Sequence, residues 1–378
     1  QFGYNQLWLA LYTLPLIVAV QESCARIGAV TGKGLAGAIK EVYGRKLVYF
    51  LVALVLLANT LNIGADLGAM AAAANLVIPL PIPLLAVFFA VGIVLLEIFL
   101  SYKAYSRVLR LLVLSLLAYP ISILLIREPW LLLVKATLVP HLELNFPFLF
   151  IVVGVLGTTI SPYLFFWQAS QEVEEEKSGS KSKSLLKNLR LDTFLGMLFS
   201  SFTAWCIIVV AATVLHGNGV TDIKTAADAA RALEPLVNSF PNAGYIAKIL
   251  FASGIVGLGL LGIPVLAGSS AYAVSETLNW PEGLNLKLKK AHGFYGVIVA
   301  STFAGLFLNF IGIDPIKALV YAAVFNGISA VPLLYFIGKL ASNPQVMGSH
   351  TGGLLTKTLV WLTFVVMLVS AASLLFLK

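Results

Sequence analysis

The stretch from Gly157 to Tyr163 reads GTTISPY and places oxygen-bearing side chains within an otherwise apolar segment. Pro162 lacks an amide hydrogen and clashes with the preceding turn, so it weakens a helix here. Backbone groups freed inside a membrane must be satisfied by protein or must line a wet cavity. Two interpretations stay open. The stretch is either a kink closed by Ser and Thr hydroxyls, or an interrupted helix whose oxygens bind a cation.

Two other apolar segments carry polar side chains that invite the same question. The segment NTLNIGADLGAM contains Asp66, and the segment VYAAVFNGISAVPLLY contains Asn326 directly before a glycine. A charged group at the bilayer centre costs about 2.5–3.5 kcal/mol on insertion scales, so it usually faces a cavity or a partner. Asp66 is either a structural hydrogen-bonding group or part of an ion pathway. Asn326 is either an interhelical hydrogen-bonding group or a contributor to a site.

Acidic side chains near the ends of these segments have simpler explanations. Glu22 precedes Arg26 by one helical turn, and that spacing predicts an ion pair. Glu97 is expected to pair with Lys103 in the same way. The acidic run 172–176 is expected to be a solvated loop, and attraction of cations is the alternative.

The composition indicates which elements position these residues. Of the 378 residues, 59% are hydrophobic and 11% are charged, against roughly 45–50% and about 25% in soluble domains, and the mean hydropathy is +0.94. We therefore predict an all-α polytopic membrane protein with one transmembrane domain over residues 1–378. Ten spans of roughly 20 apolar residues are expected. They lie near 5–29, 47–75, 84–102, 108–126, 147–170, 192–215, 245–274, 293–312, 315–338 and 354–377.

Several functional classes are excluded by what the sequence lacks. It has no nucleophile elbow, no phosphate-binding loop and no HExxH motif, so an enzyme is not expected. Cys24 and Cys206 have no metal-ligand spacing. The net charge of +8 is explained by basic loops facing anionic lipid, and a nucleic-acid partner is not expected. No ATP or other cofactor is implied.

Lys and Arg concentrate in every second connection, around residues 33–46, 103–110, 177–190 and 287–290. By the positive-inside rule these connections are cytoplasmic, which places Gln1 and the C-terminus outside. Because the chain would then begin outside without a basic leader, we expect a further helix before it. The default location is a bacterial inner membrane, and a monomer is expected.

Three segments together resemble the Nramp (natural resistance-associated macrophage protein) family of divalent metal transporters. They are FGYNQLWLALYTLPLIVAVQESCARIGAVTGKGL, NTLNIGADLGAM and GTTISPYLFFWQASQ, which are similar to the second, third and sixth helices of that family. The resemblance covers essentially the whole chain in span order. It implies the LeuT-like fold of two inverted five-helix repeats plus an eleventh helix, with the first helix missing here. In the family, that first helix carries an Asp-Pro-Gly-Asn type motif.

The resemblance also implies which residues form the site. The sixth helix of the family reads Ala-x-x-Met-Pro-His, and its Ala carbonyl and Met sulfur contact the metal. Here the matching positions hold Thr158, Ser161, Pro162 and Tyr163, and Gln168 stands at a second His position. In the third helix Asp66 and the following leucine match the family, whereas the family's Glu position is an alanine. Asn326 is a further candidate from the tenth helix.

These replacements exchange a soft sulfur ligand for hard oxygen ligands. Thioethers favour transition metals, whereas a serine hydroxyl is a hard oxygen ligand that suits Mg²⁺. Loss of both His positions and of the Glu position removes groups expected to relay protons. The pattern resembles the Nramp-related magnesium transporter branch and implies uptake of Mg²⁺, with Mn²⁺ as well, without proton coupling. The alternatives are a proton-coupled Mn²⁺/Fe²⁺ transporter and a non-transporting metal-sensing receptor. An amino-acid carrier on the same scaffold is a further alternative.

Overall fold

The computed structural model describes residues 1–99, 114–126, 128–177, 185–237 and 242–376, and this part of the chain is helical throughout, with connecting turns. Ten long helices form the body. They are α1 (Leu7–Thr31), α3 (Arg45–Asn75), α4 (Ile82–Phe99), α8 (Phe146–Thr159), α9 (Pro162–Lys177), α10 (Leu185–Val214), α13 (Ala243–Leu278), α14 (His292–Leu308), α15 (Pro315–Ser342) and α17 (Leu354–Phe376).

Shorter helices connect them. They are η1 (Gly3–Gln6), α2 (Leu35–Tyr43), η2 (Leu114–Leu117), α6 (Ala118–Leu125), α7 (Trp130–Leu138), η3 (His216–Asn218), α11 (Ala226–Ala230), η4 (Arg231–Leu233), α12 (Glu234–Val237), η5 (Leu288–Lys290), α16 (Pro344–Met347) and η6 (Gly348–His350). The sequence did not lead us to expect α2 or α7, which lie in predicted connections.

Within the described ranges, eight segments are long and apolar enough to cross a membrane, and His292–Leu308 is a shorter apolar helix. These nine correspond to nine of the ten predicted spans. The remaining span, 108–126, lies partly outside the described residues, which show helix over Leu114–Leu125. Lys103, the predicted partner of Glu97, also lies outside them.

The starts of two important helices follow from local sequence. Asn145 caps α8, because its side-chain oxygen accepts a hydrogen bond of 2.9 Å from the Phe148 amide. Asp314 caps α15 by accepting hydrogen bonds from the amides of Ile316 and Lys317. Each cap is followed by a proline, whose fixed φ suits the first helical turn.

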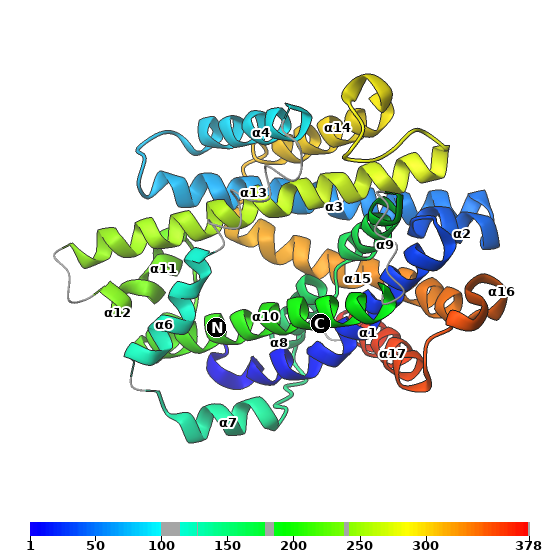
Figure 1. Cartoon of the computed structure of the whole chain (residues 1–378). Coiled ribbons are helices and arrows are strands. Elements are labelled where there is room, and N and C mark those ends of the chain that lie inside the picture. Colours follow the sequence, from blue (N-terminus) through cyan, green and yellow to red (C-terminus); the bar gives the residue numbers. More distant parts are fainter. Residues whose placement is uncertain (100–113, 127, 178–184, 238–241, 377–378) are drawn as a thin grey trace.

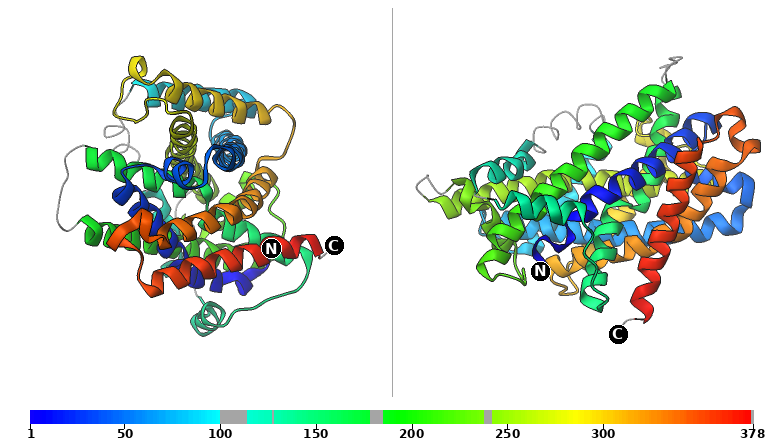
Figure 2. Two further views of the ribbon diagram at one scale, coloured as in Figure 1. Left: turned by 90° about the vertical axis from the view of Figure 1, so that its right-hand side faces the viewer. Right: turned by 90° about the horizontal axis from the view of Figure 1, so that it is seen from below.

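The helices form two packed groups (Figure 1). In one group, α3 lies beside α13, and α4 and α14 cover them together (Figure 2). In the other group, α1 packs against α9, α10 and α17, and α8 packs against α15. Figure 2 shows α1 and α17 side by side with opposite directions, so the start of α1 and the end of α17 lie toward one side of the bundle.

The interrupted helix α8–α9 lies between two apolar clusters. Ile160, Phe165 and Phe166 are fully buried in the cluster formed with α1, α15 and α17. Tyr163 and Trp167 instead pack against the cluster formed by α3, α4, α13 and α14. The helix therefore contributes to both halves of the core through opposite faces.

Candidate metal-cation site

The structure breaks the helix within the stretch GTTISPY, and the break is short. The helix α8 ends at Thr159 and α9 begins at Pro162, so only Ile160 and Ser161 lie between them. Ile160 leaves the helical region with φ −106° and ψ 67°, although its amide still bonds Leu156 O at 2.7 Å. Since Pro162 has no amide hydrogen, the carbonyl of Thr158 lacks the donor that a continuous helix would supply. This carbonyl therefore has no backbone donor four residues on, and in the structure it accepts a hydrogen bond from Ser161 Oγ.

Hydroxyl groups partly close the interruption. Ser161 is fully buried, and its Oγ is a donor to both Gly157 O at 2.5 Å and Thr158 O at 3.0 Å. The hydroxyls of Thr158 and Thr159 both donate to Val155 O, at 2.9 and 2.8 Å. The back-bonding that the sequence suggested is therefore present. A serine hydroxyl that donates still has lone pairs, so Ser161 Oγ retains acceptor capacity toward a cation.

Gly157 permits a close crossing between α8 and α15. A Cβ atom placed on Gly157 would overlap Ala323 O and the backbone nitrogen of Gly327. A Cβ on Gly327 would in turn lie 2.9 Å from Val153 O. The two helix backbones are in contact at these glycines, as small residues allow in membranes. Asn326, next to Gly327, is brought to the interruption by this crossing.

Asn326 forms a reciprocal amide pair with Asn62 of α3. Asn62 Nδ2 donates to Asn326 Oδ1 at 2.8 Å, and Asn326 Nδ2 donates to Asn62 Oδ1 at 3.0 Å. Asn326 is only 1% exposed. The structure thus shows the interhelical hydrogen bond that was one of the two interpretations of this residue. Its role as a metal ligand stays a prediction and requires the pair to open.

Asp66 lies one turn beyond Asn62 on the same side of α3, where α9 and α13 approach. Gly262 of α13 faces its carboxylate, since a Cβ on Gly262 would lie 3.7 Å from Asp66 Oδ2. Tyr163 of α9 packs against the same apolar cluster as the Asp66 region of α3. No described residue donates a hydrogen bond to Asp66 or forms an ion pair with it. This carboxylate therefore differs from the amides one turn earlier, which are paired.

Gln168 belongs to the far part of α9. Its Nε2 donates to Glu172 Oε1 at 3.0 Å. It lies five residues beyond Tyr163, a rise of about 7.5 Å along the helix. Its place in a transport pathway stays a prediction. The acidic run is not a loop as expected, because residues 172–176 continue α9.

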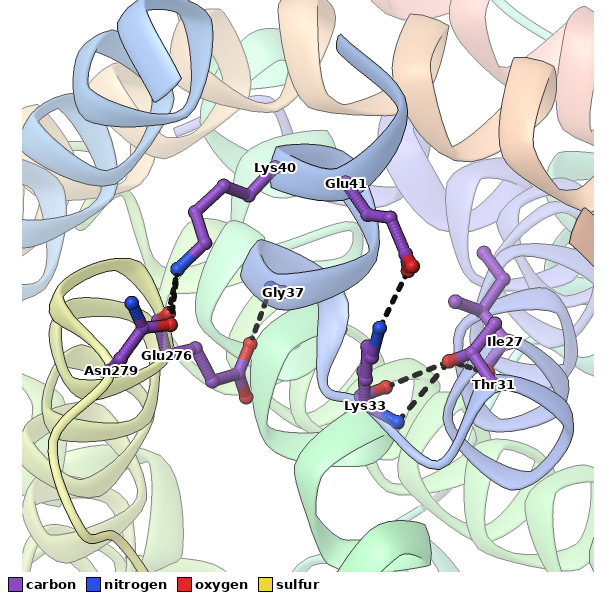
Figure 3. Close-up of polar contacts among 8 residues, drawn as sticks. All are labelled: Ile27, Thr31, Lys33, Gly37, Lys40, Glu41, Glu276 and Asn279. Carbon is purple, nitrogen blue, oxygen red and sulfur yellow. Dashed lines mark hydrogen bonds and ion pairs between the residues drawn. The ribbon is translucent and has the colours of Figure 1, made fainter. Parts of the chain in front are cut away.

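The far part of α9 is tied to α13 and α2 by a group that we call the Glu276 clamp, formed by Glu276, Gly37, Lys40 and Ser170. Glu276 Oε2 accepts from the amide of Gly37 at 2.8 Å, and Oε1 accepts from Ser170 Oγ at 2.9 Å. Lys40 Nζ donates to Glu276 O and Asn279 Oδ1, both at 2.7 Å (Figure 3). Lys40 thereby satisfies the C-terminal carbonyl end of α13, where a cation is favoured.

A second tie lies beside this clamp. Tyr272 of α13 donates a hydrogen bond to Glu174 of α9. Glu174 also accepts from the Leu284 amide at 2.8 Å and from Asn285 Nδ2 at 2.9 Å. Two carboxylates, one on each helix, thus hold α9 to α13 and to the segment after it.

The neighbours of the predicted residues come from positions distant in the sequence. Asn62, Gly262 and Gly327 face the predicted site residues, and Glu276 anchors α9. The spacing of Asn62 and Asp66 by four residues was a usable signal for a shared helix face. Nothing in the sequence pairs Asn62 with Asn326. The described ranges contain no group of three or more His, Cys, Asp or Glu side chains able to hold a metal ion.

The sequence matches the family described as natural resistance-associated macrophage protein-like (Nramp) over residues 1–377. It is 27% identical over 359 residues to the divalent metal cation transporter MntH of Klebsiella pneumoniae (strain 342), covering 92% of this chain and 80% of that protein. It is 25% identical over 370 residues to the divalent metal cation transporter MntH of Caldanaerobacter subterraneus subsp. tengcongensis, covering 92% and 82%.

The fold is similar to that of a solved structure. A crystal structure of the Eremococcus coleocola manganese transporter has a TM-score of 0.75 to this chain at 17% sequence identity. The match covers 98% of this chain and 80% of that one. The expected LeuT-like helical fold is confirmed.

Proposed function

Because the chain belongs to the Nramp family, we propose that it is a secondary transporter that carries divalent metal cations across the membrane by alternating access. We further propose that it prefers Mg²⁺, that it also carries Mn²⁺, and that it does so without proton coupling. Its relatives named above are metal transporters and not enzymes. The ion is cargo, and no cofactor is part of the proposal.

The character of the oxygens at the interruption supports the preference for a hard cation. The Thr158 carbonyl has no amide partner four residues on, and the adjacent Ser161 hydroxyl keeps lone pairs. These are neutral oxygen donors, which suit Mg²⁺ and accept Mn²⁺. Tyr163 and Asn326 would add a phenol and an amide oxygen. Asp66 would attract the cation along the pathway, since its carboxylate has no hydrogen-bond partner in the described part of the chain.

The test is uptake by the full-length protein in liposomes that contain a Mg²⁺-sensitive dye. We expect saturable Mg²⁺ uptake in the parent protein and weaker Mg²⁺ uptake, relative to Mn²⁺, in Ser161→Met. Ser253→Met is the matched control, because it makes the same change in α13, where the hydroxyl bonds only Leu250 O of its own helix. A trapped pH indicator reports proton movement in the same vesicles.

The outcomes separate the alternatives. Mn²⁺ uptake without Mg²⁺ uptake, together with acidification, would identify a proton-coupled transition-metal carrier and would overturn the proposed selectivity. Uptake of neither ion would favour a non-transporting receptor. Equal effects of Ser161→Met and Ser253→Met would show that the interrupted helix does not set selectivity.

We also propose that the protein acts as a monomer in a bacterial inner membrane, with Gln1 and the C-terminus outside. The basic connections support this orientation, since they carry Lys33, Lys40 and Lys46 after α1 and Lys287 to Lys290 after α13. Labelling of single cysteines placed at Lys33 and Lys224 by an impermeant reagent would test it. Only the cysteine at position 224 should react from outside.

A further inference from the structure

A groove on the side of the helix bundle shares no residue with the interrupted helix. It lies between α1, α10 and α17 and has a volume of about 280 Å³. Its walls are apolar and include Leu14, Val18, Phe194 and Leu359. Phe194 is 43% exposed, so the groove opens outward from helices that are long enough to span a membrane. Its surroundings are therefore lipid.

One end of this groove is charged. Glu22 lines it and accepts a hydrogen bond from Arg190 Nε at 2.5 Å. Its other oxygen forms an ion pair with Arg26 Nη2 at 2.8 Å, as the four-residue spacing predicted. Thr356 Oγ1 lies 3.3 Å from the second oxygen of Glu22. Two guanidinium groups share one carboxylate here. The cluster of Glu22, Arg26 and Arg190 thus carries one positive charge in excess.

The excess charge is accessible at Arg190. The side chain of Arg26 is 4% exposed, whereas that of Arg190 is 60% exposed. Arg190 precedes Phe194 by four residues, so the two side chains lie on the same face of α10. The guanidinium therefore sits at the mouth of the groove whose wall Phe194 forms. A phosphate is the complementary group, because guanidinium binds it with a planar fork of donors.

The length and volume of the groove indicate what kind of molecule it can hold. From Leu14 to Glu22 the helix rises about 12 Å, close to the roughly 15 Å of hydrocarbon in one leaflet. A helix about 10 Å across and 12 Å long occupies roughly 900 Å³, far more than the groove encloses. A single hydrocarbon chain suits this narrow apolar space, whereas a peptide helix does not fit inside it.

We propose that this groove binds one acyl chain of an anionic phospholipid, with the lipid phosphate against Arg190. The proposal does not depend on the transported ion. The groove is apolar along a length close to that of one leaflet, and an exposed guanidinium lies at one of its ends. The Glu22 carboxylate holds that guanidinium in place from the protein side.

The experiment measures lipid retained by the purified full chain in native mass spectrometry. Palmitoyl-oleoyl phosphatidylglycerol is compared with the phosphatidylcholine that carries the same acyl chains. We expect preferential retention of phosphatidylglycerol. Arg190→Gln should lower that retention about five-fold, from roughly 1 kcal/mol per basic residue near an anionic headgroup, and Arg190→Lys should keep most of it. Val18→Trp should block the groove and lower the retention of both lipids.

Two control variants match these changes elsewhere. Arg231→Gln removes an exposed arginine that is paired loosely with Asp228. Val91→Trp adds the same bulk at an exposed valine of α4. Neither should alter lipid retention. Thermal unfolding of each variant without added lipid verifies folding, and if Val18→Trp does not fold, Leu359→Phe takes its place.

Three results would overturn the proposal. Equal retention of the two lipids would show that the headgroup is not recognised. Unchanged phosphatidylglycerol retention in both Arg190→Gln and a folded groove-filling variant would place the lipid elsewhere. A dimer mass that Val18→Trp abolishes, with no lipid bound, would show that a second copy of the chain covers the groove.

Discussion

The two sides of the interrupted helix differ in how their polar groups are satisfied. On the α15 side, Asn326 and Asn62 saturate each other with two hydrogen bonds, and Gly157 lies against the α15 backbone. On the α13 side, Asp66 faces Gly262 without a hydrogen bond from any described residue. Both sides use the same helix, α3, and their polar residues are one turn apart. Burial in a membrane span therefore does not by itself distinguish a structural polar group from a functional one.

What distinguishes the two kinds of buried polar group is whether their hydrogen bonds are formed within the protein. A buried amide pair gains its free energy within the protein, and breaking it leaves an unsatisfied partner. A carboxylate without a partner makes no hydrogen bond or ion pair that a substitution would break, so its removal should affect folding little. We therefore expect substitutions on the α15 side to lower stability. Those on the α13 side should alter transport and leave stability nearly unchanged.

The largest effect on stability is expected from Gly157→Ala. The added methyl group would overlap Ala323 O, which is backbone and cannot rotate away. We expect a loss of about 3 kcal/mol of unfolding free energy, the upper part of the usual cost of overpacking. Denaturant titration in detergent measures it. Gly154→Ala is the control, because its Cβ would lie 3.5 Å from Val324 Cγ2, an ordinary contact. Equal losses in both variants would contradict the close crossing.

Asn326→Ala should have the next largest effect. It leaves the buried amide of Asn62 without its partner, which costs about 2 kcal/mol. A double-mutant cycle with Asn62→Ala sharpens the comparison, since the double variant should cost less than the sum of the single variants. Additive losses would mean that the two amides do not stabilise each other.

Ser161→Ala should cost about 1 kcal/mol. The substitution removes the hydroxyl that donates to Gly157 O and leaves that carbonyl without its side-chain donor. Thr159→Val is the matched control, since Val155 O would keep the hydrogen bond from Thr158. The same denaturant titration compares them. A larger loss in Thr159→Val would show that the interruption is not held by Ser161.

The smallest effect on stability is expected from Asp66→Asn. No described hydrogen bond or ion pair is lost, so the free energy of unfolding should change by about 0.5 kcal/mol or less. Metal uptake in liposomes should nevertheless fall at least about ten-fold, because the cation loses a charged group on its path. If Asp66→Asn strongly lowered stability and left metal uptake unchanged, Asp66 would be a structural residue and the contrast between the α13 and α15 sides would be wrong.

Local sequence predicted those features whose causes are local. Pro162 predicts the interruption because it acts on its own backbone, and the length of the apolar segments predicts the spans. Gly157 lies within α8 and instead permits the close crossing with α15, which is not a local effect. The short helix α2 was missed because its nine residues lie in a basic connection between Gly34 and Gly44. The pairing of Asn62 with Asn326 joins residues 264 positions apart. It depends on a crossing angle between α3 and α15 that neither segment encodes alone.

The two halves of the interrupted helix are attached to different partners. The half ending at Thr159 is seated on the backbone of α15, whereas the half beginning at Pro162 is bound to α13 through Ser170 and Glu174. Ile160 and Ser161 therefore connect a half that lies against α15 to a half that is also held by α13, while Phe165 and Phe166 of the second half share the apolar cluster of α1 and α15. A rotation of α9 against α8 at these two residues would change the spacing between the Thr158 carbonyl and the Ser161 hydroxyl. The spacing of two oxygens that could contact a cation would then depend on how the helices of the bundle are oriented.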